Sequence, residues 1–299
     1  MILDKLEVCK ETRKLTASSL FKVLKDLLKT RDQISEKYLG DAWYEELTSN
    51  KEIFHEGWYV PPPHGIGVLF ATEKNPSRIK FKSLRQEEFW PRNDVFLNKQ
   101  NGIAMVYASP VHKVTGIIGD FGLTIYLGNN KTIQKELRKY LFIVQDVFRF
   151  IKIGMKISEI HTYISALVSS KGFTNEWWMS ITDPTGTNFG HTIPATDTNW
   201  TAKERQILLK GENNWDRVIG MISQKRKFIN EYEESVVREG MALTVEPRLI
   251  VKNNPKMPTV YYHTIVALRE NGKKELLTNF DEIFRLTGMN YLIRTLDLR

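Results

Sequence analysis

The stretch Gly240-Met241-Ala242-Leu243-Thr244-Val245-Glu246-Pro247-Arg248 decides how the rest of the chain is interpreted. The apolar residues on both sides of Glu246 and Pro247 predict a buried β-strand that is broken at the proline. A lone carboxylate in such a strand costs several kcal/mol to bury unless a metal ion or another cation meets it. Glu246 is therefore the first candidate site residue, either as a metal ligand or as the partner of a lysine or of Arg248.

The composition of the chain is that of an ordinary globular protein. Its 299 residues are 41% hydrophobic and 26% charged, and this length suffices for one large core or two modest ones. No run of 18 or more apolar residues occurs, so we expect no membrane span. The acidic stretch from Met1 to Glu7 lacks the apolar segment of a signal peptide. A single cysteine, Cys9, excludes an internal disulfide and a cysteine-rich zinc site, and we expect a cytoplasmic protein.

Basic residues outnumber acidic ones, 43 against 35, but they are spread along the whole chain. A nucleic-acid binder usually gathers its basic charge into a stripe with interleaved aromatic side chains. The densest basic region, residues 203–238, mixes both signs of charge and carries an apolar stripe. The mixed charges predict a solvated helical face rather than a nucleic-acid site. The apolar stripe predicts that the region packs as a lid or as a homodimer contact.

The order of the predicted elements is typical of an α+β protein, because strands, helices and strands follow one another without strict alternation. Trp177 and Trp178 are expected in the core. Helices are predicted over residues 3–30, 34–47, 132–152, 158–170 and 201–238, and strands over residues 68–71, 102–108, 113–118, 123–127, 243–251 and 259–268.

Five landmarks follow one another along the chain: Pro63-His64-Gly65, Gly116–Asp120 with Ile125–Gly128, a helix pair with Ile157–Ile160 and Lys171–Phe173, Phe189–Ile193, and Gly240–Pro247 with Tyr261–Val266. In this order they resemble the superfamily of methionine aminopeptidase, aminopeptidase P and creatinase. The resemblance covers roughly residues 1–285 and departs at 73–96 and 197–236. It implies one catalytic-type domain over residues 1–299 with the pita-bread fold, an antiparallel curved sheet flanked by helices, and insertions at those two places.

The resemblance also implies a set of metal ligands. Active members of the superfamily place two aspartates, one histidine and two glutamates around two metal ions. By motif, Asp120 matches the second aspartate, His191 the histidine and Glu246 the first glutamate. These three belong to one metal position, so the resemblance implies at most one ion, Mn²⁺, Fe²⁺, Co²⁺ or Zn²⁺. Such an ion polarises a carbonyl and lowers the pKa of bound water.

Other ligand positions depart from the family pattern. The first aspartate falls on Ser109, or on Tyr107 if the hairpin is longer, and the last glutamate falls on Tyr262. A second histidine expected shortly after the first is absent. In an alternative register Asp120 takes the place of the first aspartate and Lys131 that of the second, but the glycines of the hairpin favour the first register.

Several residues are candidates for proton transfer. His64 and His263 are the nearby histidines, and Tyr262 is a candidate donor to an oxyanion. Each candidate has a plain structural alternative. Asp120 fits a hairpin cap, His191 a satisfied core histidine, and His64 a rigid surface loop after three prolines.

Three functions remain, and we rank them in this order. The first is a divergent aminopeptidase-like hydrolase that acts on a peptide or a small amide with at most one metal ion. The second is a non-catalytic relative whose cavity binds a peptide or a protein partner. The third is a metal-free hydrolase of the creatinase kind, with His191 as the acid–base. Retention of three ligands of one metal position favours the first, and loss of two ligands favours the second.

Overall fold

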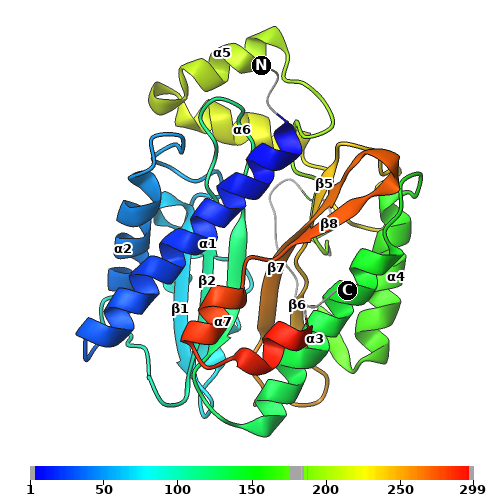
Figure 1. Ribbon diagram of the computed structural model, residues 1–299. Helices are drawn as coiled ribbons and strands as arrows, with labels where there is room; N and C mark the ends of the chain where they lie inside the picture. The colour runs from blue at the N-terminus through cyan, green and yellow to red at the C-terminus, as the bar shows by residue number, and fades with distance from the viewer. Residues whose placement is uncertain (1–3, 176–182, 184, 187, 296–299) are drawn as a thin grey trace.

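The computed structural model describes residues 4–175, 183, 185–186 and 188–295 of the chain (Figure 1). Trp177 and Trp178 lie outside the described residues. The α-helices of the described part are α1 (Lys5–Thr30), α2 (Glu36–Thr48), α3 (Lys131–Phe150), α4 (Ile157–Ser170), α5 (Ala202–Leu209), α6 (Trp215–Lys225) and α7 (Asp281–Leu286). Its strands are β1 (Ile66–Thr72), β2 (Gly102–Ala108), β3 (Phe121–Tyr126), β4 (Phe173–Asn175), β5 (Ala242–Val245), β6 (Arg248–Val251), β7 (Val260–Leu268) and β8 (Lys274–Leu277).

The described strands form one antiparallel sheet of eight strands in which β7 is central. The main order is β1-β2-β3-β7-β6-β4, and β5 and β8 also pair with β7. The first half of β7 pairs with β3 and β6, whereas its second half pairs with β5 and β8. Both neighbours of β7 therefore change near His263. On one side the change falls at Glu246 and Pro247, which separate β5 from β6.

Helices cover this sheet through apolar stripes. In α3 the side chain of Asn130 accepts a hydrogen bond from Thr132 N at 2.9 Å, which caps the first turn. The buried residues of α3 recur at helical spacing, from Ile133 and Leu137 to Leu141 and Val144, and this face packs against β7 and α4. Figure 1 shows α2 beside β1 and α1 beside α2, while α3 and α4 lie beyond β6.

The helix α1 approaches the start of β3 unusually closely. A Cβ atom on Gly119 would lie 2.7 Å from the backbone nitrogen of Arg13 and 2.4 Å from Cγ2 of Thr12. Only glycine permits this contact without displacement of the helix. Because of it, Arg13, which is 0% exposed, reaches across to the centre of the sheet.

Two predicted elements differ from the structure. The strand predicted over residues 113–118 is wrong, because residues 113–115 form a turn in which Nδ1 of His112 lies 3.0 Å from Oγ1 of Thr115, and Ile118 forms an isolated bridge with Val111. The helix predicted over residues 201–238 is divided into α5 and α6 and ends at Lys225. The chain from Arg226 onward runs back to the loop at 190–192, and Ile229 N donates to Gly190 O at 2.8 Å.

Buried apolar side chains from Leu6 to Leu292 form one continuous core. The number of domains stays a prediction. No helix in the described part of the chain combines the length and the apolar character needed to cross a membrane. The cytoplasmic location also stays a prediction.

Candidate functional site

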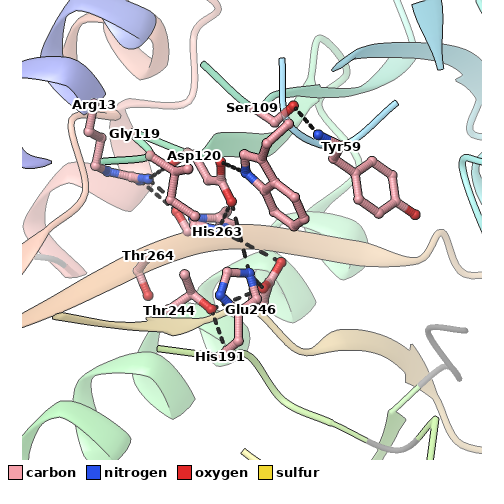
Figure 2. Close-up of polar contacts among 12 residues, drawn as sticks. Arg13, Tyr59, Ser109, Gly119, Asp120, His191, Thr244, Glu246, His263 and Thr264 are labelled. Carbon is pink, nitrogen blue, oxygen red and sulfur yellow. Dashed lines mark hydrogen bonds and ion pairs between the residues drawn. The ribbon is translucent and has the colours of Figure 1, made fainter. Parts of the chain in front are cut away.

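Four titratable side chains meet where β7 changes its neighbours, and we call them the acid–histidine cluster: Asp120, His191, Glu246 and His263 (Figure 2). Nε2 of His191 lies 3.5 Å from Oε1 of Glu246 and 3.9 Å from Oδ2 of Asp120. Nε2 of His263 lies 3.8 Å from Oε2 of Glu246 and 3.9 Å from Oδ2 of Asp120. Their side chains are at most 11% exposed. The structure thus brings together the three predicted metal ligands and one predicted proton-transfer residue.

Neighbouring side chains hold both acids of the cluster by hydrogen bonds. Nε1 of Trp58 donates to Oδ1 of Asp120 at 2.7 Å. Oγ1 of Thr244 donates to Oε1 of Glu246 at 3.0 Å, and the hydroxyl of Tyr261 donates to Oε2 at 3.2 Å. Three of the four carboxyl oxygens therefore already accept a hydrogen bond from the protein.

The loop that carries His191 is fastened to β5. His191 N donates to Oγ1 of Thr244 at 2.8 Å, and Thr244 N donates to His191 O at 2.8 Å. A Cβ atom on Gly190, whose φ is +145°, would lie 2.2 Å from Thr244 O, so the loop needs glycine to come this close. Nδ1 of His191 lies 3.0 Å from Thr192 O, which fixes the ring with Nε2 toward the cluster.

Burial dominates the electrostatics of the cluster. It raises the pKa of Asp120 to about 8, against the hydrogen bond from Trp58, and it raises the pKa of Glu246 to about 7. Burial also lowers the pKa of His191 to about 3, helped by the positive charge of Arg226. The pKa of His263 falls well below its usual value for the same reason, burial first and then the charge of Arg13. At neutral pH both histidines are therefore uncharged.

A pocket opens onto the cluster at His191 and Glu246. Its empty space is about 420 Å³ with the open mouth included, but its inner end has room for only about one water molecule. The guanidinium of Arg226 lies in it, 4.2 Å from the ring centre of Trp58 and 4.9 Å from that of Phe228. The described lining comprises four aromatic side chains, two asparagines, two arginines and two members of the cluster: Trp58, Tyr59, Tyr107, Phe228, Asn175, Asn188, Arg226, Arg248, His191 and Glu246.

The structure places His64 outside the cluster. Nδ1 of His64 lies 2.8 Å from Oε1 of Glu56, and its ring stacks on Tyr44 with 3.9 Å between ring centres. The side chain is 40% exposed. A positive φ of 58° after three prolines turns it toward the surface, which agrees with the plain reading of a surface loop.

Tyr262 also lies away from the cluster, which corrects its expected position. Successive residues of a strand point to opposite faces of the sheet. His263 faces the cluster, so Tyr262 faces the core, where its ring centre lies 5.6 Å from that of Phe280 and 5.9 Å from that of Phe284. The residue that β7 presents to Glu246 beside His263 is Tyr261.

The residues at the other candidate ligand positions are Ser109, Tyr107 and Lys131, and the structure places each of them differently. Ser109 is buried, where its Oγ accepts from Tyr59 N at 3.1 Å and donates to Gly65 O at 3.2 Å. Tyr107 lines the pocket, with its ring centre 6.3 Å from that of His263. Lys131 begins α3 at the surface, so the alternative register receives no support from its position.

Sequence reasoning missed Trp58, Arg13 and Arg226 at this site. The signal for Arg13 was present, because it falls on the apolar stripe of α1 one turn after Cys9 and one turn before Ala17, where a charged residue is unusual. No comparable signal marks Arg226, which follows the end of α6.

The cluster does not fit a resident metal ion as it is placed. Within the described ranges, no group of three or more His, Cys, Asp or Glu side chains is arranged to hold one. The buried charges of Arg13 and Arg226 act on both acids and oppose a second cation.

Comparisons with known proteins then place the fold. A scan against models of protein families gave no match, and no curated protein sequence matches the chain. Methionine aminopeptidase from Thermotoga maritima is a similar solved structure (TM-score 0.57, 17% identity, covering 93% of this chain and 99% of that one). X-Pro aminopeptidase from Thermotoga maritima is also similar (TM-score 0.57, 12% identity, covering 92% of this chain and 60% of that one). So is prolidase from Pyrococcus horikoshii (TM-score 0.58, 13% identity, covering 92% of this chain and 61% of that one).

The chain spans about 60% of the length of the X-Pro aminopeptidase and prolidase chains, but almost all of the methionine aminopeptidase. At these identities the likeness concerns the fold. It confirms the prediction from the sequence that the chain has the α+β pita-bread fold.

Proposed function

We propose that this chain is a non-catalytic pita-bread protein whose pocket binds the end of a peptide or of a protein partner. The observation that carries the proposal is the buried guanidinium of Arg226 beside the acid–histidine cluster. Active members of the superfamily have metal ions among these acids, and here the protein supplies the positive charge from its own chain. An arginine is charged at all physiological pH values and provides no water of lowered pKa, so it replaces the charge of a metal but not its chemistry.

The lining of the pocket supports a peptide as the ligand. A peptide backbone offers both N–H donors and C=O acceptors, and the pocket offers both kinds of partner. Nε2 of His191 and the carboxyl of Glu246 accept, while the guanidinium of Arg226 donates. Aromatic side chains add apolar contact area. Because the inner space holds about one water molecule, only a terminal group of the ligand reaches the cluster. The similar structures are named as peptidases, and this name supports the same ligand class.

The first-ranked function, a hydrolase with one metal ion, remains the second candidate. Its support is that Asp120 and Glu246 both lie within 3.9 Å of His191, since nothing in a metal-free binding protein requires these three residue types together. Two observations speak against it. Among the described residues no group of potential ligands is arranged to hold a metal ion, and the buried positive charges of Arg13 and Arg226 repel another cation.

Metal content and turnover separate the candidates. The purified chain is equilibrated with Mn²⁺, Fe²⁺, Co²⁺ or Zn²⁺ in turn, and bound metal is measured by elemental analysis. We expect no stoichiometric metal and no hydrolysis of dipeptides or tripeptides. About one metal ion per chain that is lost in His191→Ala and kept in His64→Ala would establish the hydrolase instead. Turnover of a small amide in the presence of a chelator would establish the metal-free hydrolase.

Binding is tested directly with a library of short peptides that have free ends, read by fluorescence anisotropy in chelator. We expect binding that weakens about tenfold or more in Arg226→Met, which corresponds to about 1.4 kcal/mol. The matched control is Arg205→Met, on α5 outside the pocket lining, and it leaves the affinity unchanged. Equal affinities of wild type and Arg226→Met would contradict the proposal.

A further inference from the structure

The side chain of Arg13 is buried against three backbone carbonyl groups around the cluster, and Figure 2 shows it beside Asp120 and His263. Nη1 donates to Asp120 O, and Nη2 donates to His263 O at 2.6 Å and to Thr278 O at 2.8 Å. In addition, Nη1 lies 3.2 Å from Nδ1 of His263. These contacts connect α1 to the start of β3, to the middle of β7 and to the segment after β8.

The contact with the imidazole has a chemical consequence. A guanidinium has donors only, and a neutral imidazole has one N–H donor and one acceptor nitrogen. Nδ1 of His263 must therefore accept from Arg13, and the proton of the ring is on Nε2. His191 is in the opposite situation, because its Nδ1 faces the carbonyl of Thr192, which only accepts. The proton of His191 is on Nδ1, and its Nε2 is a lone pair.

We infer that Arg13 is a positioning residue that holds His263 in the Nε2–H tautomer, opposite to that of His191, so that the two histidines present a donor and an acceptor to the same pair of carboxyl groups. The inference deepens the proposed function, and it rests on that function for the claim that the acid–histidine cluster works without a metal ion. An imidazole whose Nε2 carries a proton cannot bind a metal through that nitrogen, so Arg13 makes one cluster member unavailable as a ligand.

Two buried atoms support this assignment. Oδ2 of Asp120 and Nε2 of His263 form no hydrogen bond within the described part of the chain, and they face each other at 3.9 Å. With the proton on Nε2, His263 donates toward a lone pair of Oδ2, and when Asp120 is protonated its own proton has the Nε2 lone pair of His191 as an acceptor, 3.9 Å from Oδ2. With the proton on Nδ1, Nδ1–H of His263 would point at the guanidinium of Arg13.

The tautomers are measured by NMR on the whole chain with ¹⁵N-labelled histidine, through two-bond ¹H–¹⁵N correlations that distinguish Nδ1–H from Nε2–H. Losses of signal in His263→Gln and His191→Gln assign the two rings. In wild type at neutral pH we expect Nε2–H for His263 and Nδ1–H for His191. Arg13→Lys keeps a donor and keeps the tautomer, whereas Arg13→Met shifts His263 toward Nδ1–H. Lys14→Met, at the neighbouring exposed position of α1, changes neither ring.

An Nδ1–H signal for His263 in wild type would overturn the inference, and so would an unchanged spectrum in folded Arg13→Met. If Arg13→Met fails to fold, the other two spectra decide the question. Nε2–H for His263 in both wild type and Arg13→Lys supports the inference, and Nδ1–H in either contradicts it. A parallel titration with Zn²⁺ keeps the two proposals apart. Stoichiometric zinc in wild type would contradict the metal-free function and leave the tautomer result standing. An Nδ1–H signal with no zinc would contradict only the role of Arg13.

Discussion

At the scale of single residues, Trp58 is the partner that makes the burial of Asp120 tolerable. Its indole N–H donates to a carboxyl group that is 0% exposed, and this bond opposes the rise of the Asp120 pKa. We expect Trp58→Phe to lower the free energy of unfolding by about 1.5–3 kcal/mol at about pH 9, where Asp120 is ionised, because this is the range for a lost hydrogen bond to a charged group, and to raise the pKa of Asp120 further. Urea unfolding measures the loss.

The control for this substitution is Trp215→Phe. Nε1 of Trp215 donates to Gly57 O at 3.0 Å, but the side chain is half-buried and its acceptor is an uncharged carbonyl. Its loss is expected at about 0.5–1.5 kcal/mol. Equal losses in the two variants would show that Asp120 gains nothing particular from the indole.

Neighbouring tyrosines on β7 provide a second residue-scale prediction. The hydroxyl of Tyr261 donates to Glu246, whereas that of Tyr262 is buried without a hydrogen-bond partner among the described residues. Removing an unsatisfied buried hydroxyl is close to neutral or stabilising, and removing a bonded one is costly. We therefore expect Tyr261→Phe to destabilise the fold by about 1–2 kcal/mol and Tyr262→Phe by less than about 0.5 kcal/mol. Chemical denaturation of both variants tests the order, and the reverse order would contradict the placement of the two rings.

These two tyrosines show where sequence reasoning about the site stops. Motif order predicts that Asp120, His191 and Glu246 meet, because each motif carries its own position in the fold. Which residue of the Tyr261–His263 run faces the cluster depends on the register of β7, and a slip of one residue exchanges the faces. That register is set by pairing with β3, where Gly122 lies opposite His263. No local pattern in the run reveals it.

At the scale of elements, the contact between α1 and the residue before Asp120 determines where Arg13 lies. A methyl group on Gly119 would lie 2.7 Å from the backbone of α1, which cannot yield as a flexible side chain can. We expect Gly119→Ala to cost about 1–3 kcal/mol, the usual range for overpacking, and to move Arg13 away from His263. Thermal or urea unfolding measures the cost, and the histidine NMR signals report the displacement.

Gly220→Ala is the matched control for this prediction. Gly220 lies within α6, and a Cβ atom there has no neighbour within 4 Å. The same substitution should therefore stabilise the chain by about 0.5–1 kcal/mol, through helix propensity alone. A loss of stability at Gly220 similar to that at Gly119 would contradict the close contact as the cause.

The same scale shows which elements a sequence can predict. α3 carries a long apolar stripe and a capping Asn130, so both its type and its start are evident locally. The segment after α6 is different. Periodicity extends the helix past Lys225, but Arg226 and Phe228 turn into the pocket, and Thr192 N donates to Lys227 O at 2.8 Å. A tertiary contact of this kind overrides helix propensity. The lid or dimer role expected for residues 201–238 stays a prediction.

At the scale of the whole molecule, the cluster connects parts of the chain that are far apart in sequence. Arg13 comes from α1, Asp120 from the start of β3, and His263 from β7, while Arg226 follows α6. The buried arginines and the buried acids lie together only while all these elements are in place, because a buried charge without compensation is strongly unfavourable. Stability of the fold should therefore depend on the protonation of the cluster.

The direction of this dependence follows from the shifted pKa values. Burial raises the pKa of Asp120 from 3.8 to about 8 and that of Glu246 from 4.5 to about 7, so the folded chain holds protons that the unfolded chain has released. Their contribution to stability is complete at acidic pH and is lost as pH rises through 7–8. His191, lowered from 6.5 to about 3, has the opposite effect, which is complete above pH 6.5. Above that pH the two acids act, and Cys9, whose pKa burial raises to about 12, adds a loss of the same sign toward pH 8.5.

We therefore expect the free energy of unfolding to fall between pH 6.5 and 8.5, with a slope of at most about 1.4 kcal/mol per pH unit for each proton released. Arg13 and Arg226 stay charged over this range and do not reverse the sign. In Asp120→Asn, whose amide oxygen can still accept from Trp58, the fall should be clearly smaller, whereas Asp26→Asn at an exposed position of α1 should keep it. Urea midpoints at three pH values measure each slope. Parallel slopes in wild type and Asp120→Asn would mean that Asp120 is already ionised in the folded chain at pH 6.5, and that the two arginines balance its charge more fully than burial opposes it.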